Sequence, residues 1–326
     1  MNIEHIFSTE FTAETFADTA LQIFDYQYNN NEIYRNFAQL LRRTPAQVST
    51  LQQIPFLPIS FFKTHQIQTG AWTPEKIFRS SGTTGMTTSC HFVKETALYE
   101  QSFTQGFRRF YGAPDEYCFL ALLPSYLERE DSSLVYMLQA LMKQSRHPDN
   151  GFYLDDYQRL SCKLRDLEQT GQKTLLLGVS YALLDFSEKY PLPLKNTIVM
   201  ETGGMKGKRR EMLRSELHEI LCQRFDLEYI HSEYGMAELF SQAYSKGSGI
   251  FQTPPWMRVM TRQPDDPLTL AQTGKKGGIN IIDLANVHSC SFIATQDLGT
   301  LFPDGTFEIS GRFDHSDLRG CNLMIQ

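Results

Sequence analysis

A loop rich in hydroxyl groups and glycines, F-R-S-S-G-T-T-G at residues 78–85, has the composition of a phosphate-binding segment. Its hydroxyl and glycine residues are Ser80, Ser81, Gly82, Thr83, Thr84 and Gly85. Glycine lets the backbone approach an anion closely and turn several N–H groups onto it, and the hydroxyls add uncharged donors. A Walker A loop would end in G-K-[ST], whereas Met86 follows this one. Taken alone, the same composition also suits a polar surface turn.

Two further glycine-containing clusters follow short apolar runs. The first reads M-E-T-G-G-M-K-G-K and contains Gly203 and Gly204, and the second reads H-S-E-Y-G-M-A-E. Ligands of open α/β sheets bind at the carboxyl ends of strands, where a glycine pair lets a flat ligand approach the backbone. In the second cluster, Tyr234 offers a ring for stacking and Glu238 offers an oxygen ligand of the kind Mg²⁺ prefers. Taken alone, the first cluster is equally consistent with a tight turn, and the second is more typical of a strand-to-helix turn.

Shorter motifs near the C-terminus add a carboxylate, a guanidinium and a thiol. T-Q-D-L-G contains Asp297, which can accept hydrogen bonds from ribose hydroxyls, and G-R-F-D contains Arg312 and Asp314. The segment R-G-C-N-L contains Cys321. A thiolate is a strong nucleophile towards an activated acyl group, whereas a lone cysteine is more often a small buried hydrophobe. Both interpretations of Cys321 remain open from the residues alone.

The elements that must position these motifs alternate between strands and helices over residues 77–235. Short unbroken apolar runs, such as residues 174–179 and 197–200, are separated by helical stretches. This pattern predicts a parallel or mixed sheet covered by helices on both faces. It also predicts a helix over residues 206–224 and a further strand over residues 227–231.

We expect residues 1–326 to form one domain of the α/β class with three parts. Residues 1–75 are helical and end in a proline-rich extended strap, I-P-F-L-P-I-S-F-F-K. Residues 76–248 form the α/β nucleotide-binding core. Residues 249–326 form a small β-rich subdomain, with turn signals such as Gly277-Gly278 between its strands.

The composition excludes several classes of protein. Of 326 residues, 41% are hydrophobic and 21% charged, which is ordinary for a globular protein. The net charge of −6, without a basic stripe, argues against binding to nucleic acid or to a membrane surface. We find no apolar stretch long enough to span a bilayer and no signal peptide. The six cysteines are scattered singly, so we expect a cytoplasmic protein with free thiols, all of them in the core except Cys321.

Taken together, S-S-G-T-T-G, G-G, Y-G-M-A-E, D-L-G and G-R-x-D follow the order and spacing of the core motifs of adenylate-forming enzymes. These enzymes include acyl-CoA synthetases, firefly luciferase and peptide-synthetase adenylation domains. Within them, the chain resembles the acyl-protein synthetase (LuxE-like) family, which activates long-chain fatty acids in bacterial luminescence. I-P-F-L-P-I-S-F-F-K, T-G-G-M-K-G and R-G-C-N-L carry this narrower resemblance, which covers residues 37–324.

The resemblance implies a fold and a role for each motif. The fold would be the large-domain core of adenylate-forming enzymes, with mixed sheets covered by helices and a small β-rich subdomain. The residues implied to bind ATP are Ser80, Ser81, Gly82, Thr83, Thr84, Gly85, Gly203, Gly204, Tyr234, Gly235, Met236, Asp297 and Arg312. Glu238 is implied to bind Mg²⁺, and Asp314 to lie at a hinge. The catalytic residues implied are Thr84, Lys206 and Cys321, the last as the acyl acceptor.

The chain departs from most of these enzymes after the hinge motif. They continue for about a hundred residues as a lid domain that bears a lysine for adenylation. We expect the C-terminal lid to be absent here, because the sequence ends at Gln326. The lysine would then be absent, come from another chain, or be replaced by a core residue such as Lys206 or Lys208.

The resemblance implies activation of a carboxylic acid, first of all a fatty acid, with ATP and Mg²⁺ as an acyl-adenylate. The acyl group would then pass to a protein thiol. One alternative is an aryl- or acyl-CoA ligase, or a carrier-protein loading enzyme, that uses a lid or acceptor in trans. A second is a catalytically retired nucleotide-binding scaffold. The expected partners are the carboxylic acid and an acyl-accepting protein, a reductase or CoA.

Overall fold

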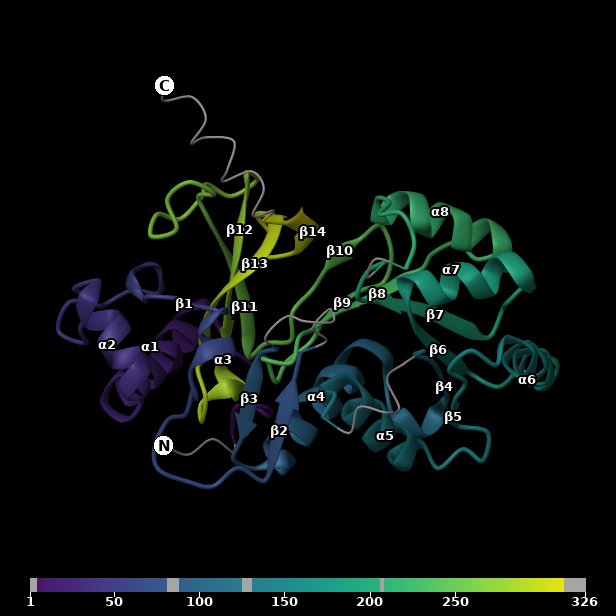
Figure 1. Ribbon diagram of the computed structural model, residues 1–326, viewed down its shortest axis with the longest axis horizontal. Coiled ribbons are helices and arrows are strands. Elements are labelled where there is room, and N and C mark those ends of the chain that lie inside the picture. Colours follow the sequence, from purple (N-terminus) through teal and green to yellow (C-terminus); the bar gives the residue numbers. More distant parts are fainter. Residues whose placement is uncertain (1–4, 81–87, 125–130, 206–207, 314–326) are drawn as a thin grey trace. The chain divides into compact units, whose positions relative to one another are not determined.

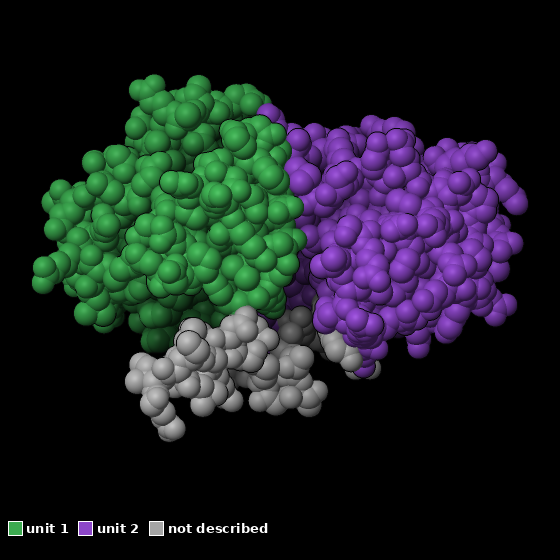
Figure 2. Space-filling view, turned by 90° about the horizontal axis from the view of Figure 1, so that it is seen from above, with its two compact units in different colours: residues 1–71, 255–326 green, residues 72–254 purple. Residues whose placement is uncertain are grey.

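The computed structural model describes residues 5–80, 88–124, 131–205 and 208–313 (Figure 1). The chain divides into two compact units (Figure 2). The first unit combines the two ends of the chain, Met1–Ala71 and Pro255–Gln326, and the second is Trp72–Pro254. The N-terminal helical part and the C-terminal β-rich part therefore belong to the same unit.

The first unit is built on an antiparallel sheet in the order β14-β13-β12-β11. The strands are β11 (Met257–Arg262), β12 (Lys276–Asp283), β13 (Phe292–Leu301), β14 (Phe307–Arg312) and the short β1 (Leu57–Pro58), which pairs parallel to β13. The helices are α1 (Ala13–Asn30), α2 (Glu32–Leu40) and α3 (Phe61–Thr64), with 3₁₀ turns η1 (Leu51–Gln53) and η3 (Leu284–Asn286). The helices α1 and α2 lie beside this sheet, as Figure 1 shows.

Buried polar and aromatic side chains attach the N-terminal helices to the sheet. Gln27 of α1 donates to the Val287 carbonyl at 2.9 Å and accepts from the Ser291 N–H at 3.0 Å. The ring of Phe292 in β13 packs edge-on against Phe24 and stacks on Tyr34. Because Gln27 is fully buried, these bonds satisfy backbone groups that water cannot reach.

Two expectations for this unit are wrong in detail. The strap is extended only as far as β1, and its second half forms α3, because no proline follows Pro58 and Phe62 is buried as an anchor. Gly277 and Gly278 lie inside β12 rather than in a turn. A Cβ on Gly277 would overlap with the Arg262 carbonyl of β11, so glycine is needed there for close approach of the strands.

The second unit contains a sheet in the order β5-β4-β6-β7-β8-β9, parallel from β5 to β8, with β9 antiparallel. The strands of this sheet are β4 (Cys118–Leu122), β5 (Gly151–Phe152), β6 (Thr174–Val179), β7 (Thr197–Thr202), β8 (His231–Tyr234) and β9 (Ala243–Ser245). The unit also contains the short strand β10 (Ile250–Phe251), outside this sheet, and a separate hairpin of β2 (Lys76–Arg79) and β3 (Cys90–Val93). The helices are α4 (Thr96–Tyr111), α5 (Ser133–Ser145), α6 (Tyr157–Thr170), α7 (Ser180–Lys189) and α8 (Arg214–Phe225), with the 3₁₀ turn η2 (Pro114–Glu116). Helices α4 and α5 lie on one face of this sheet and α7 and α8 on the other (Figure 1). This is the doubly covered sheet that the apolar runs predicted.

Two elements of this unit differ from the expected ranges. The helix expected over residues 206–224 begins only at Arg214, and Leu213 before it is 70% exposed. The strand expected over residues 227–231 lies further along the chain, as β8. Apolar spacing misled both predictions, because Leu213 is apolar and yet exposed, whereas the side chains of β8 are polar and yet buried or half-buried.

None of the helices in the described ranges is long and apolar enough to cross a membrane.

Candidate functional site

The candidate site lies where the parallel strands β7 and β8 end at the same edge of their sheet. In the register, Glu201 pairs with Ser232 and Thr202 pairs with Glu233. Directly after β7, Gly203 is exposed and has a φ of 74°, a left-handed conformation that glycine adopts without strain. A Cβ on Gly204 would meet nothing within 4 Å, so open space adjoins this turn. The edge can therefore receive a ligand at the carboxyl ends of the strands.

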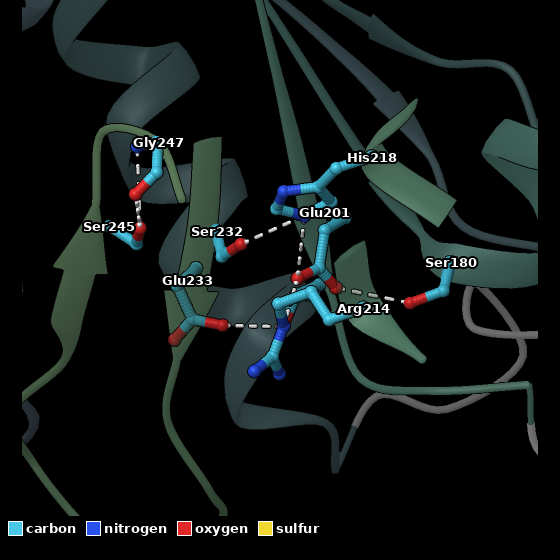
Figure 3. Close-up of polar contacts among 9 residues, drawn as sticks. Ser180, Glu201, Arg214, His218, Ser232, Glu233, Ser245 and Gly247 are labelled. Carbon is cyan, nitrogen blue, oxygen red and sulfur yellow. Dashed lines mark hydrogen bonds and ion pairs between the residues drawn. The ribbon is translucent and has the colours of Figure 1, made fainter. Parts of the chain in front are cut away.

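A buried carboxylate, Glu201, gathers polar contacts on the α7–α8 face (Figure 3). Its oxygens accept from Arg214 Nε at 2.9 Å and from Ser180 Oγ at 3.1 Å, and His218 Nε2 lies 3.6 Å away. Burial raises its pKa, but hydrogen bonds from His218 and Ser232 and the charge of Arg214 together lower the pKa below the usual value. Glu201 is therefore ionised at neutral pH, although only 2% of it is exposed.

Arg214 extends this cluster towards the Tyr234 turn. Its guanidinium lies over the Phe251 ring, 5.1 Å from the centroid, and this ring meets Tyr234 edge-on at 5.8 Å. Tyr234 is itself only 8% exposed. Tyr234, which the resemblance assigns to adenine stacking, thus packs against the Phe251 ring, and the Arg214 guanidinium contacts that ring in turn.

A second buried carboxyl, Glu233, lies on the opposite face, because consecutive residues of a strand point to opposite sides. Thr202 Oγ1 donates to Glu233 Oε2 at 2.5 Å. Burial raises the pKa of Glu233, the Thr202 hydrogen bond lowers it, and the negative charge of Glu201 raises it, so that the pKa is about 7. Two neighbouring carboxyls therefore have opposite protonation preferences in this site.

The hairpin of β2 and β3, which flanks the phosphate-loop sequence, is hydrogen-bonded to the Y-G-M-A-E turn after β8. Ser80 closes the base of the loop, since its N–H donates to the Ser89 carbonyl and its hydroxyl accepts from the Ser89 N–H. From β3, the buried His91 donates through Nδ1 to the Ala237 carbonyl at 2.7 Å. This bond fixes the segment next to Glu238, which is 4% exposed. The structure thus brings the hairpin and the Y-G-M-A-E turn together within one unit.

Gly235 and Met236 complete this turn. A Cβ on Gly235 would overlap with the Glu233 carboxylate, so the position requires glycine. The Met236 carbonyl accepts from the Leu239 N–H at 3.1 Å, and Met236 itself is half-buried. The turn is a fixed structure with little room for larger residues.

Asp297 and Arg312 lie in the first unit, on adjacent strands. They are directly opposite each other in the register of β13 and β14, and Arg312 Nε lies 3.1 Å from Asp297 Oδ1. Asp297 is 8% exposed, whereas the Arg312 side chain is 70% exposed. The structure therefore brings together the two residues expected to hold the ribose.

Several predicted site residues lie outside the described residues. They are Ser81, Gly82, Thr83, Thr84, Gly85, Lys206, Asp314 and Cys321. Their expected roles stay predictions.

The remaining cysteines are not uniformly buried, which corrects the expectation that they lie in the core. Cys118 and Cys290 are buried, and burial raises the pKa of each thiol to about 12. Cys162 is exposed, and Cys90 and Cys222 are half-buried. Cys90 lies at the start of β3, and Cys162 and Cys222 lie on α6 and α8, where apolar counting does not separate the outward-facing positions from the core.

The sequence interpretation missed Glu201, Glu233, Arg214 and His218. The acid inside V-M-E-T was the one available signal, because an acidic residue in an apolar run must find a partner if the run is buried. The partners on α8 have no signal of their own in the sequence.

Two bacterial enzymes are similar to this chain along nearly all of it. The long-chain-fatty-acid–luciferin-component ligase of Aliivibrio fischeri is 22% identical over 330 residues, which are 93% of this chain and 86% of that protein. The ligase of the same name from Vibrio harveyi is 23% identical over 325 residues, 93% and 85% of the two chains. No family model matches the chain. The resemblance to acyl-protein synthetases is confirmed by these two relatives.

Solved structures of ligases share the fold. A 2-hydroxyisobutyryl-CoA ligase in complex with 2-HIB-AMP and CoA superposes with a TM-score of 0.67 over 93% of this chain and 70% of that one, at 12% identity. The chain has the adenylate-forming fold. ATP-bound MatB from Rhodopseudomonas palustris gives a TM-score of 0.55 over 72% of this chain, at 15% identity, and the match spans about half of MatB, 47% of its length. The predicted adenylate-forming core, with α/β and β-rich parts, is confirmed.

Proposed function

We propose that this protein activates a carboxylic acid, in the first place a fatty acid, with ATP and transfers the acyl group to a protein thiol. The observation that carries the proposal is the similarity to two fatty-acid ligases over 93% of this chain and 86% and 85% of their lengths. The geometry of the described residues supports it, because the hairpin strands that flank the phosphate-loop sequence lie in the same unit as the turns after β7 and β8. The phosphate-loop hairpin is bonded to the turn next to Glu238, beside the glycine turn that follows β7.

The reaction takes place in two steps. First, a carboxylate oxygen of the acid attacks the α-phosphorus of ATP, the bond to the bridging oxygen breaks, and pyrophosphate leaves. Then a thiolate attacks the acyl carbon, and AMP leaves with the electron pair of the broken bond. The first step requires in-line positioning and neutralisation of charge. We assign phosphate binding to Ser80–Gly85, adenine contact to Gly203, Gly204 and the 234–236 turn, and ribose contact to Asp297 and Arg312.

The residues present fit a magnesium ion. Mg²⁺ is usually held by one or two carboxylates together with the phosphates of the substrate. Glu238 supplies a buried carboxylate on a turn that His91 holds in place. Within the described ranges no group of three or more His, Cys, Asp or Glu residues could hold a metal ion, so the other ligands would be phosphate oxygens and water. When bound, Mg²⁺ would neutralise charge on the departing pyrophosphate.

The test is acid-dependent release of pyrophosphate, measured with fatty, aryl and amino acids, with and without EDTA. We expect release with fatty acids and added acyl mass on the protein. If acyl-CoA forms in the presence of CoA while the protein mass stays unchanged, the CoA ligase is the correct interpretation, which the likeness to 2-hydroxyisobutyryl-CoA ligase favours. Absence of release with every acid, while ATP still binds, would support a nucleotide-binding scaffold instead.

Replacing Glu238 by glutamine is expected to lower kcat/KM for ATP by about 10²–10³-fold, because an uncharged amide is a weak ligand for Mg²⁺. Raising the Mg²⁺ concentration should restore part of the loss. The measurement is pyrophosphate release as a function of ATP and Mg²⁺. Glu228→Gln, at an exposed position before β8, is the matched control and should match the wild type. If Glu238→Gln releases pyrophosphate with the same dependence on ATP and Mg²⁺ as Glu228→Gln, then Glu238 is not the metal ligand.

A further inference from the structure

The ends of β7 and β8 are joined by one buried carboxyl. Glu233 is 7% exposed and accepts from Thr202 Oγ1, on the last residue of β7, at 2.5 Å. Its Oε1 lies against Gly235, so closely that a Cβ at that position would overlap with it. Oε2 thus accepts a hydrogen bond from Thr202, directly before the Gly203–Gly204 turn, and Oε1 lies beside Gly235 in the turn after β8.

We propose that Glu233 is a positioning residue whose carboxyl holds the glycine turns after β7 and β8 in one arrangement. This inference rests on the proposed function, since the same two turns are assigned there to the nucleotide. Glu233 does not touch the ligand in this scheme. It acts through Thr202 and Gly235, because movement of either turn would break a buried contact.

The surroundings of Glu233 favour its neutral form. Tyr99 and Tyr111 of α4 and Tyr244 of β9 interact with it electrostatically, and burial is the main reason that their own pKa values are raised. The charged group that acts on it from β7 is Glu201, which is also an acid. The Thr202 hydroxyl donates to Glu233 and favours the ionised form, but burial and the neighbouring Glu201 carboxylate outweigh this hydrogen bond, so ionisation of Glu233 should loosen the two turns.

Ionisation falls in the physiological range, because the pKa of Glu233 is about 7. At pH 6 the carboxyl is mostly protonated, and at pH 8 it is mostly ionised. The two turns should therefore be well ordered at pH 6 and looser at pH 8. Glutamine at this position keeps an acceptor for Thr202 and stays neutral at every pH, so Glu233→Gln should remove the pH dependence.

The experiment is hydrogen exchange of the ligand-free protein followed by mass spectrometry, with rates corrected for the intrinsic effect of pH. We expect the wild type to lose about tenfold of its protection in residues 201–205 and 233–237 between pH 6 and pH 8. Glu233→Gln should keep its protection at both values. Thr202→Val should lose protection in both turns at both values. Residues 118–122 of β4 should be unchanged throughout and serve as the internal control.

The inference is overturned if Glu233→Gln loses protection with pH as the wild type does, or if Thr202→Val leaves both turns unchanged. Glu233→Ala is a second test, and it should resemble Thr202→Val if it folds. A kinetic measurement adds a readout that a merely structural residue would not change. The KM for ATP should rise above pH 7 in the wild type but not in Glu233→Gln. Because exchange is measured without ligand, its outcome is independent of whether any acid is activated, so the two proposals can fail separately.

Discussion

Serine in place of Cys321 is expected to abolish acylation of the protein while the first release of pyrophosphate persists. Pyrophosphate leaves before the thiol acts, so acyl-adenylate still forms. The serine hydroxyl has a much higher pKa than a thiol and is a weak nucleophile without a base beside it. The measurement is the intact mass of the protein after incubation with ATP, Mg²⁺ and the acid, with pyrophosphate followed in the same sample.

The chain offers a matched control for this variant. Cys162 is an exposed thiol on α6, and Cys162→Ser should keep the acyl mass. The buried Cys118 and Cys290 are unsuited to the role, because burial raises the pKa of each to about 12 and the thiolate would be scarce. Acyl mass on Cys321→Ser with undiminished stoichiometry would remove Cys321 from the mechanism and leave the ligase proposal standing.

Methionine in place of Arg214 is expected to lower the free energy of unfolding by about 3 kcal/mol at pH 8. The substitution leaves the carboxylate of Glu201, which is 2% exposed, without its charged partner. The loss should be smaller at pH 5, because the pKa of Glu201 rises in the variant and the carboxyl can take up a proton. In the wild type the pKa is lowered, so the contribution of the ion pair is present above the ordinary pKa and disappears only in more acidic solution.

Urea denaturation at pH 5 and pH 8 measures this effect. Arg224→Met, on an exposed position of the same helix α8, is the control and should change stability by less than about 0.5 kcal/mol. The double variant Glu201→Gln with Arg214→Met should recover part of the loss, because it removes the unpaired charge. If Arg214→Met loses the same unfolding free energy relative to the wild type at both pH values, the Glu201 carboxylate does not depend on this partner.

Local sequence was enough to predict most of the second unit. The unbroken run T-L-L-L-G-V has no polar face, so it must be buried on both sides, and it is the parallel strand β6. The adenylate-forming fold was implied by the resemblance of the glycine-rich motifs, in order and spacing, to those of adenylate-forming enzymes.

The tertiary structure alone decided which polar groups are buried and which ends of the chain meet. Strand β8 has the sequence H-S-E-Y, which is not typical of a core strand. It can be buried because Thr202 and His218, which are distant in sequence, form hydrogen bonds with the side chains of Glu233 and Ser232. In the same way, Gln27 of α1 bonds to Val287 across 260 positions of the chain. Sequence patterns report the local preference of each segment. Pairing between distant polar groups depends on the packed fold, because only there does the lack of water make each bond necessary.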